Sequence, residues 1–150
     1  MKVQSKYLGE VEVSDDRIIH FESGLPAFED KKQFVILPFG DEAPFFILQS
    51  IDEVEIAFVI VNPFDFFNEY QVKLPDSTIE MLEIEKEEDV AIFAMLTVQE
   101  PFANTTANLQ APVVINAKKQ KGKQVVLSDS GYKTKHQLMP VTASSSQEGR

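Results

Sequence analysis

Hydrophobic and polar residues alternate along much of the chain with the two-residue period of a β-strand. In the segment 104–116, NTTANLQAPVVIN, the odd positions are small or apolar. The even positions at its start are neutral and polar: Asn104, Thr106, Asn108 and Gln110. Successive side chains of a strand point to opposite faces, so we predict one extended strand with an uncharged hydrogen-bonding face that extends over roughly 20 Å.

Short apolar runs between turn signals predict further strands. Residues 34–39 and 45–50 flank the sequence GDEAP and are typical of a hairpin, whereas 55–61 lacks polar alternation and is expected to be a central strand. The basic sequence KKQKGK is expected to form a hairpin tip around Gly122. The other predicted strands lie at 7–13, 17–21, 90–98 and 123–129.

One short helix is predicted within residues 75–89, PDSTIEMLEIEKEED. Ser77 and Glu80 have the spacing of a capping box, in which the two residues satisfy free amides at a helix start. Ile79 and Leu82 share the face that would pack on a sheet.

Together these elements predict a mostly β, single-domain protein: a small antiparallel barrel, closed or nearly closed, with one short helix. A chain of 150 residues fits one such domain. We expect the domain to cover residues 1–139, because the sequence from 140 to 150 is polar, lacks periodicity and is expected to be a disordered tail.

Charge is distributed unevenly. Residues 1–100 contain 7 Lys or Arg and 22 Asp or Glu, a net charge of −15, while residues 101–150 contain 7 and 2, a net charge of +5. This excess of acidic residues disfavours direct binding of nucleic acid and would steer a basic partner toward the protein. The sequence shows no signal-peptide pattern and no apolar run long enough to span a membrane, so we expect a cytoplasmic protein.

Residue patterns typical of catalysis or metal binding are not found in the sequence. There is no Cys, the two His are far apart in the sequence, and no nucleophile motif or glycine-rich phosphate loop occurs. We therefore expect neither an enzyme nor a bound metal or cofactor. An alternative is a small β-barrel enzyme or ligand-binding protein, with a pocket carboxylate of raised pKa near Glu29 or Glu100.

Groups suited to protein recognition are more prominent. The segment 62–70, NPFDFFNEY, places Phe64 and Phe66 beside Asp65 directly after the predicted central strand. An exposed ring with an acidic rim is typical of a protein–protein hot spot. Phe102, in a predicted loop, is a candidate for a second aromatic anchor.

Three motifs resemble the FliW family of flagellar assembly factors. They are FESGLPAFED at 21–30, FFILQSIDEVEIAFVIVNPF at 45–64 and TANLQAPVVINAKKQKGKQVVL at 106–127. The resemblance covers about residues 1–139. Ala27 stands where the family usually has glycine, which predicts a turn after Pro26 that does not require positive φ.

The resemblance implies a non-enzymatic regulator that binds CsrA, an RNA-binding translational repressor, and relieves its repression of flagellin translation. Flagellin itself is implied as a competing partner, and we expect the free protein to be a monomer. A flagellin chaperone without effect on RNA binding is the alternative. The residues expected to contact partners are Asn62, Pro63, Phe64, Asp65, Phe66, Phe102, Asn104, Asn108 and Gln110.

Overall fold

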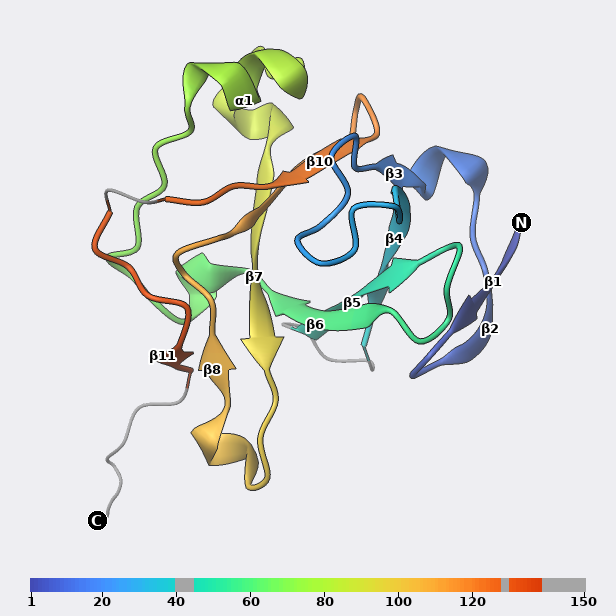
Figure 1. Cartoon of the computed structure of the whole chain (residues 1–150), viewed down its shortest axis with the longest axis horizontal. Coiled ribbons are helices and arrows are strands. Elements are labelled where there is room, and N and C mark those ends of the chain that lie inside the picture. The colour runs from blue at the N-terminus through green and yellow to red at the C-terminus, as the bar shows by residue number, and fades with distance from the viewer. Residues whose placement is uncertain (40–44, 128–129, 139–150) are drawn as a thin grey trace.

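The computed structural model describes residues 1–39, 45–127 and 130–138 (Figure 1). One α-helix, α1 (Asp76–Met81), and four short 3-10 helices, η1 (Asp15–Arg17), η2 (Pro63–Asp65), η3 (Glu87–Asp89) and η4 (Phe102–Asn104), lie among the strands. The strands are β1 (Lys2–Ser5), β2 (Gly9–Glu12), β3 (Ile19–His20), β4 (Gln33–Pro38), β5 (Phe45–Ser50), β6 (Ala57–Val61), β7 (Ala91–Thr97), β8 (Thr106–Ala107), β9 (Val113–Asn116), β10 (Lys121–Gln124) and β11 (His136–Gln137).

Seven strands close into a barrel, which confirms the predicted fold class. Their order is β7-β6-β5-β4-β3-β10-β9, and the pairing of β9 with β7 completes the ring. Among the described pairings only β3 with β10 is parallel. We call these seven strands the barrel wall. β8 and β11 extend from one edge of β7, and β1 and β2 form a separate hairpin.

The central strands β4, β5 and β6 are buried on both faces, because alternate side chains point into the barrel and away from it. Inward positions of the wall, such as Phe34, Leu48 and Ile60, fill the barrel together with Phe21. Outward positions of β4 and β5, such as Val35 and Ile47, are covered by the β1–β2 hairpin. Burial on both faces explains why β5 and β6 lack polar alternation, and the predicted central position of 55–61 is confirmed by β6 lying between β5 and β7.

The prediction of one strand over 104–116 is wrong. Residues 108–112 separate β8 from β9, although both strands pair with the same edge of β7. The side-chain Oδ1 of Asn108 accepts hydrogen bonds from the backbone N–H groups of Gln110 (3.1 Å) and Ala111 (3.0 Å). An Asn side chain that bonds to the backbone two and three residues later favours a turn over continued strand pairing.

The turn after Pro26 also differs from expectation. Ala27 has φ of 71°, in the left-handed region, so the prediction that this turn avoids positive φ is wrong. The close approach of the chain at Gly24 sets the path of this loop: a Cβ at Gly24 would lie 2.6 Å from the Cα of Glu29. Ala27 therefore holds a backbone conformation that glycine adopts at lower cost.

Two further local predictions need correction. The hairpin turn lies at 117–120 rather than around Gly122, which is in β10 where a Cβ would lie 2.7 Å from the Phe21 ring. The capping box is not formed, because α1 starts at Asp76 with Pro75 as N-cap and without a side-chain capping bond. At Gly122 the close approach to Phe21 explains the difference, because the chain there packs as part of the strand. The predicted tail at 140–150 lies outside the described residues.

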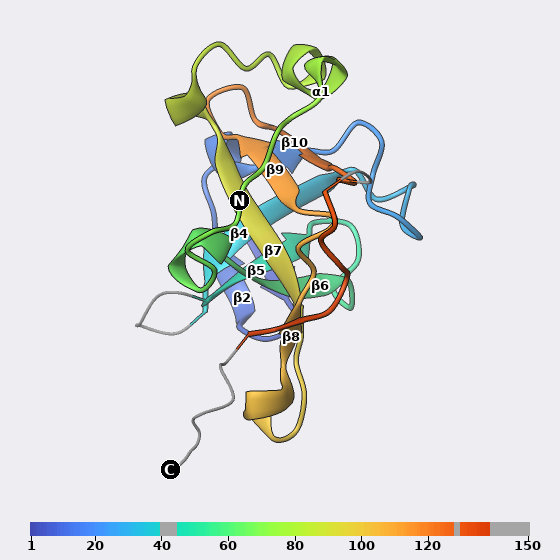
Figure 2. The ribbon, with the colours of Figure 1, turned by 90° about the vertical axis from the view of Figure 1, so that its left-hand side faces the viewer.

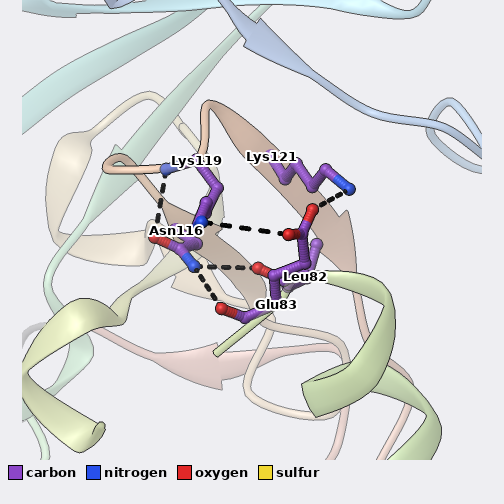
Figure 3. A network of polar contacts seen from close by, with 5 residues as sticks. All are labelled: Leu82, Glu83, Asn116, Lys119 and Lys121. Carbon is purple, nitrogen blue, oxygen red and sulfur yellow. Dashed lines mark hydrogen bonds and ion pairs between the residues drawn. The ribbon is translucent and has the colours of Figure 1, made fainter. Parts of the chain in front are cut away.

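Residues 62–90, which we call the crossover segment, leave the wall after β6 and return at β7, carrying η2, α1 and η3. The end of α1 is fixed by the buried Asn116 of β9 (Figure 3). Its Nδ2 donates to the backbone carbonyls of Leu82 (2.8 Å) and Glu83 (3.3 Å). Lys121 Nζ lies 2.6 Å from the Glu83 carboxylate, and the hydrogen bond between them lowers the pKa of that carboxyl.

Candidate partner-binding surfaces

The end of β6 is shaped by Asn62 and Pro63. The Asn62 side chain accepts a hydrogen bond from the backbone N–H of Phe64 (2.9 Å), and the buried Pro63 begins η2. This tight turn leaves Phe64 41% exposed and Asp65 exposed, while Phe66 is half-buried. Asn62 and Pro63 therefore position the neighbouring rings, with Pro63 itself covered.

Phe66 and Phe102, far apart in the sequence, meet over a third ring. The Phe45 centroid lies 6.3 Å from that of Phe66 and 5.7 Å from that of Phe102, in edge-on geometry for the second pair. Phe102 is 39% exposed at the tip of the β7–β8 hairpin. Asn104 is exposed in the same short helix, η4. The structure thus places two of the predicted aromatic residues in one cluster.

Two exposed aromatic residues that sequence reasoning missed adjoin this cluster. Tyr7, in the β1–β2 turn, stacks on Phe39 with centroids 5.7 Å apart, and both rings are more than a third exposed. Phe39 is tied to Phe45 by a backbone hydrogen bond of 3.0 Å. The signal for Tyr7 was an aromatic residue two positions before Gly9, within a segment predicted to be a strand. We call Tyr7, Phe39, Phe45, Phe66 and Phe102 the aromatic end.

Phe64 belongs to a different surface. Its ring packs on Tyr70, with centroids 5.6 Å apart, and it lines an open groove of about 1060 Å³ on the other side of η2. The groove is also lined by Asn62, residues 71–74, Ile79, residues 84–87 and residues 90–93. Figure 2 shows η3 at the start of β7 and η2 on the same side of that strand. The residues that line the groove include Phe64 of η2 and Glu87 of η3. We call it the edge groove.

Tyr70 joins the crossover segment to the region of Asn108 and Gln110. Its buried hydroxyl donates a 2.8 Å hydrogen bond to the backbone carbonyl of Leu109. Burial, with a smaller contribution from Tyr132, raises the pKa of this hydroxyl above its ordinary value. The centroid of the Tyr70 ring lies 4.8 Å from that of the Tyr132 ring, in edge-on geometry. Tyr70 is thus a buried residue that supports the edge groove from below Phe64.

The predicted amide residues do not form one continuous face. Asn104 is exposed at the β7–β8 tip, whereas Asn108 and Gln110 are half-buried. The side-chain oxygen of Asn108 accepts a backbone hydrogen bond from Gln110, and the backbone of Gln110 bonds to the backbones of Lys133 and Leu127. Of the three amides, only Asn104 lies beside the aromatic end and is freely accessible.

The described residues offer little that resembles a catalytic or metal site. No group of three or more His, Asp or Glu within residues 1–39, 45–127 and 130–138 is arranged to hold a metal ion. Glu29 and Glu100, the carboxylates considered for a ligand pocket, are exposed and do not line the edge groove. No described helix has the length and apolar character needed to cross a membrane.

Comparison with known proteins identifies the family. The family model described as FliW protein matches residues 2–138. The chain belongs to the FliW family. A flagellar assembly factor FliW from Anoxybacillus flavithermus is 54% identical over 142 residues, 95% of this chain and 97% of the relative. The Bacillus subtilis protein of the same name is 46% identical over 138 residues, 92% and 96% of the two chains.

A solved structure extends the similarity to the fold. The crystal structure of the flagellar assembly factor FliW superposes with a TM-score of 0.88 and 48% sequence identity, covering 93% of this chain and 98% of that chain. The resemblance seen in the three sequence motifs is therefore confirmed at the level of the family. The names of these relatives describe an assembly factor rather than an enzyme.

Proposed function

We propose that this chain is a cytoplasmic flagellar assembly factor that acts by binding other proteins. Its partners are the RNA-binding translational repressor CsrA, which it antagonises, and flagellin, which competes with CsrA. Family membership and the names of the relatives support the flagellar role. The protein needs no cofactor for this function, does not bind nucleic acid directly and is a monomer when free.

The aromatic end is the observation that carries the proposal. The rings of Phe66, Phe45 and Phe102 contact one another in turn, Tyr7 packs on Phe39, and a backbone hydrogen bond links Phe39 to Phe45. Phe102 and Tyr7 are partly exposed although both are large aromatic residues. Partly exposed aromatic residues at the centre of a patch supply much of the affinity of protein interfaces. We propose that Phe66, Phe102 and Asn104 contact a partner directly, together with Asp65 at the rim.

The other residues expected at partner sites have different parts in this proposal. Asn62 and Pro63 hold η2 in place, and Phe64 faces the edge groove. Asn108 maintains the turn between β8 and β9, and Gln110 is half-buried beside it. Replacing any of these residues is expected to weaken partner binding by changing the shape of the surface, and not by removing a direct contact.

Charge adds an electrostatic step to the mechanism. A repressor that holds RNA phosphates is basic, and the −15 charge of residues 1–100 would steer it toward this protein. Once bound, the acidic domain disfavours RNA phosphates nearby, whether it covers the RNA surface or lies beside it. Raising salt from about 0.05 to 0.5 M is expected to slow association much more than it speeds dissociation. A salt-independent association rate would contradict the steering step.

A titration tests the proposed function directly. The full chain is added to CsrA bound to fluorescent flagellin leader RNA, and RNA release is followed by anisotropy; flagellin added afterwards should restore RNA binding. Phe102→Ala is expected to weaken release at least tenfold, a loss of about 1.4 kcal/mol. The matched control is Val54→Ala, at an exposed position in the β5–β6 turn, which lies at the other end of β5 from Phe45 and does not line the edge groove. If flagellin binds while RNA stays on CsrA, the protein is a flagellin chaperone instead.

A further inference from the structure

One edge of β7 has no partner strand among the described residues along the first three residues of β7, 91–93. β6 pairs with β7 only through Ile60 with Met95 and Val61 with Ala94, and then the chain turns away at Pro63. On the opposite edge β7 continues to pair with β9 over residues 91–93. Among the described residues, no strand therefore pairs with the β6-side edge of 91–93.

The backbone groups on this edge can be assigned from the hydrogen-bond pattern. The carbonyl of Met95 accepts a bond from the N–H of Asn108 (2.9 Å), so Met95 directs its backbone groups toward the β8–β9 edge. In an antiparallel ladder consecutive residues point to alternate edges. Ile92, three residues earlier, therefore directs its N–H and C=O to the edge that β6 has left. Continued pairing would oppose Pro63 to Ile92, and proline has no N–H to offer.

The edge groove lies along this free backbone. Residues 91–93 form one wall, and residues 71–74, which pair with no described strand, form another. The groove is lined by half-buried aliphatic side chains. They are Val72, Leu74, Ile79, Ile84, Val90 and Ile92. An incoming strand would cover these side chains and satisfy the backbone of Ile92 at the same time.

The rim of the groove is acidic on one side. Glu85 and Glu87 line it, and η3 continues with Glu88 and Asp89, against Lys73 and Lys86. The nearby Glu83 is already paired with Lys119 and Lys121. A ligand with a positive charge near the η3 end of the groove would therefore be favoured.

We propose that the edge groove binds an extended segment of a protein partner, which adds to β7 as a strand. The segment has aliphatic residues at alternate positions, which face Ile84 and Ile92, and at least one Lys or Arg toward η3. Free main-chain groups recognise a strand rather than a helix, since a helix has already used its own. This inference rests on the proposed function in that a protein is the partner, and it names the form in which that partner docks.

The test uses the ¹⁵N-labelled full chain and the synthetic peptide acetyl-KITVTIK-amide. In the free protein the Ile92 amide is expected to exchange with solvent faster than those of Phe93 and Ala94, which have strand partners. Saturating peptide is expected to slow Ile92 exchange at least tenfold. A peptide with the same side chains but N-methyl groups on alternate amides keeps its apolar surface and is expected not to bind.

Variants separate the contributions of charge and backbone. The double change Glu87→Gln and Glu88→Gln is expected to weaken peptide binding about threefold to tenfold, and Glu10→Gln with Glu12→Gln, on the β1–β2 hairpin, is expected to leave it unchanged. Binding that leaves Ile92 exchange unaltered, equal binding of the N-methylated peptide, or no binding at about 1 mM peptide would overturn the proposal. RNA release by the chain without peptide binding would leave the proposed function standing and this inference refuted.

Discussion

The barrel wall and the crossover segment are held in place by different means. In the wall, each strand shares backbone ladders with two neighbours, and the side chains of β4, β5 and β6 are buried on both faces. The crossover segment contains one α-helix of six residues, two short 3-10 helices and no strand. Individual side chains link it to the rest of the molecule. Leu82 lies in the core, Asn116 of the wall bonds to the end of α1, and Tyr70 bonds to Leu109 between β8 and β9.

This difference shows which parts of the molecule can loosen independently. A ladder distributes its stabilisation over many bonds, whereas one side-chain bond can be removed by one substitution. Both proposed surfaces depend on the crossover segment, which supplies Phe66 to the aromatic end and Phe64 to the edge groove. Loss of a contact that holds the crossover segment is therefore expected to disturb both the aromatic end and the edge groove.

The largest effect is expected for Leu82→Ala. Leu82 is 1% exposed and packs between α1 and the wall, so the cavity left behind should lower the free energy of unfolding by about 2–5 kcal/mol. Ile47→Ala in β5, equally buried, is expected to cost a similar amount. In hydrogen exchange, Leu82→Ala should mainly expose residues 71–90, while Ile47→Ala should affect the entire barrel. Uniform acceleration in both variants would remove the distinction between the two regions.

A smaller loss is expected for Asn116→Ala. The substitution removes the donor to the carbonyls of Leu82 and Glu83, and a buried carbonyl without a partner costs about 1–3 kcal/mol. Chemical denaturation measures the change. Lys118→Ala, at an exposed position of the turn that follows β9, is the control and is expected to change stability by less than about 0.5 kcal/mol. Equal losses in the two variants would mean that the helix end does not depend on Asn116.

Tyr70→Phe is expected to lower stability by about 0.5–1.5 kcal/mol, the net contribution of the bond to Leu109. It should also change the pH dependence. Because the folded protein raises the pKa of the Tyr70 hydroxyl above the unfolded value near 10.0, the folded state retains a proton that the unfolded state releases. Wild-type stability should therefore be fully present below about pH 10 and decrease above it, more steeply than in Tyr70→Phe. Parallel curves from pH 9 to 11 would contradict this.

The smallest expected effect is an increase in the free energy of unfolding, at a turn that lies outside both the barrel wall and the crossover segment. Ala27→Gly relieves the positive φ of Ala27 but gives the unfolded chain more freedom, so we expect an increase in stability of up to about 1 kcal/mol. Gly9→Ala, another residue with positive φ and open space around its Cβ position, should lose a comparable amount. Melting temperatures of the two variants in opposite directions would confirm that backbone conformation, and not packing, sets both effects.

Local periodicity accounted for most of the wall. The hairpin of β4 with β5 and the central β6 follow from neighbouring apolar runs, because their partners are close in the sequence. The break at 108–112 was not predicted, since Asn108 fits the alternating pattern and its capping role depends on the path of the backbone. For the candidate site, Phe66 and Phe102 were recognised as separate candidates, but no sequence pattern indicated that Phe45 joins them.

The amino-acid sequence by itself determined that this chain forms an acidic, mostly β domain, because side-chain alternation and net charge are properties of the sequence alone. Tertiary structure decided which rings remain exposed, which amides bond to the backbone, and that no strand among the described residues pairs with the β6-side edge of β7 at 91–93. Exposure and pairing depend on which distant segment covers a residue, and such long-range contacts are not encoded in any local pattern.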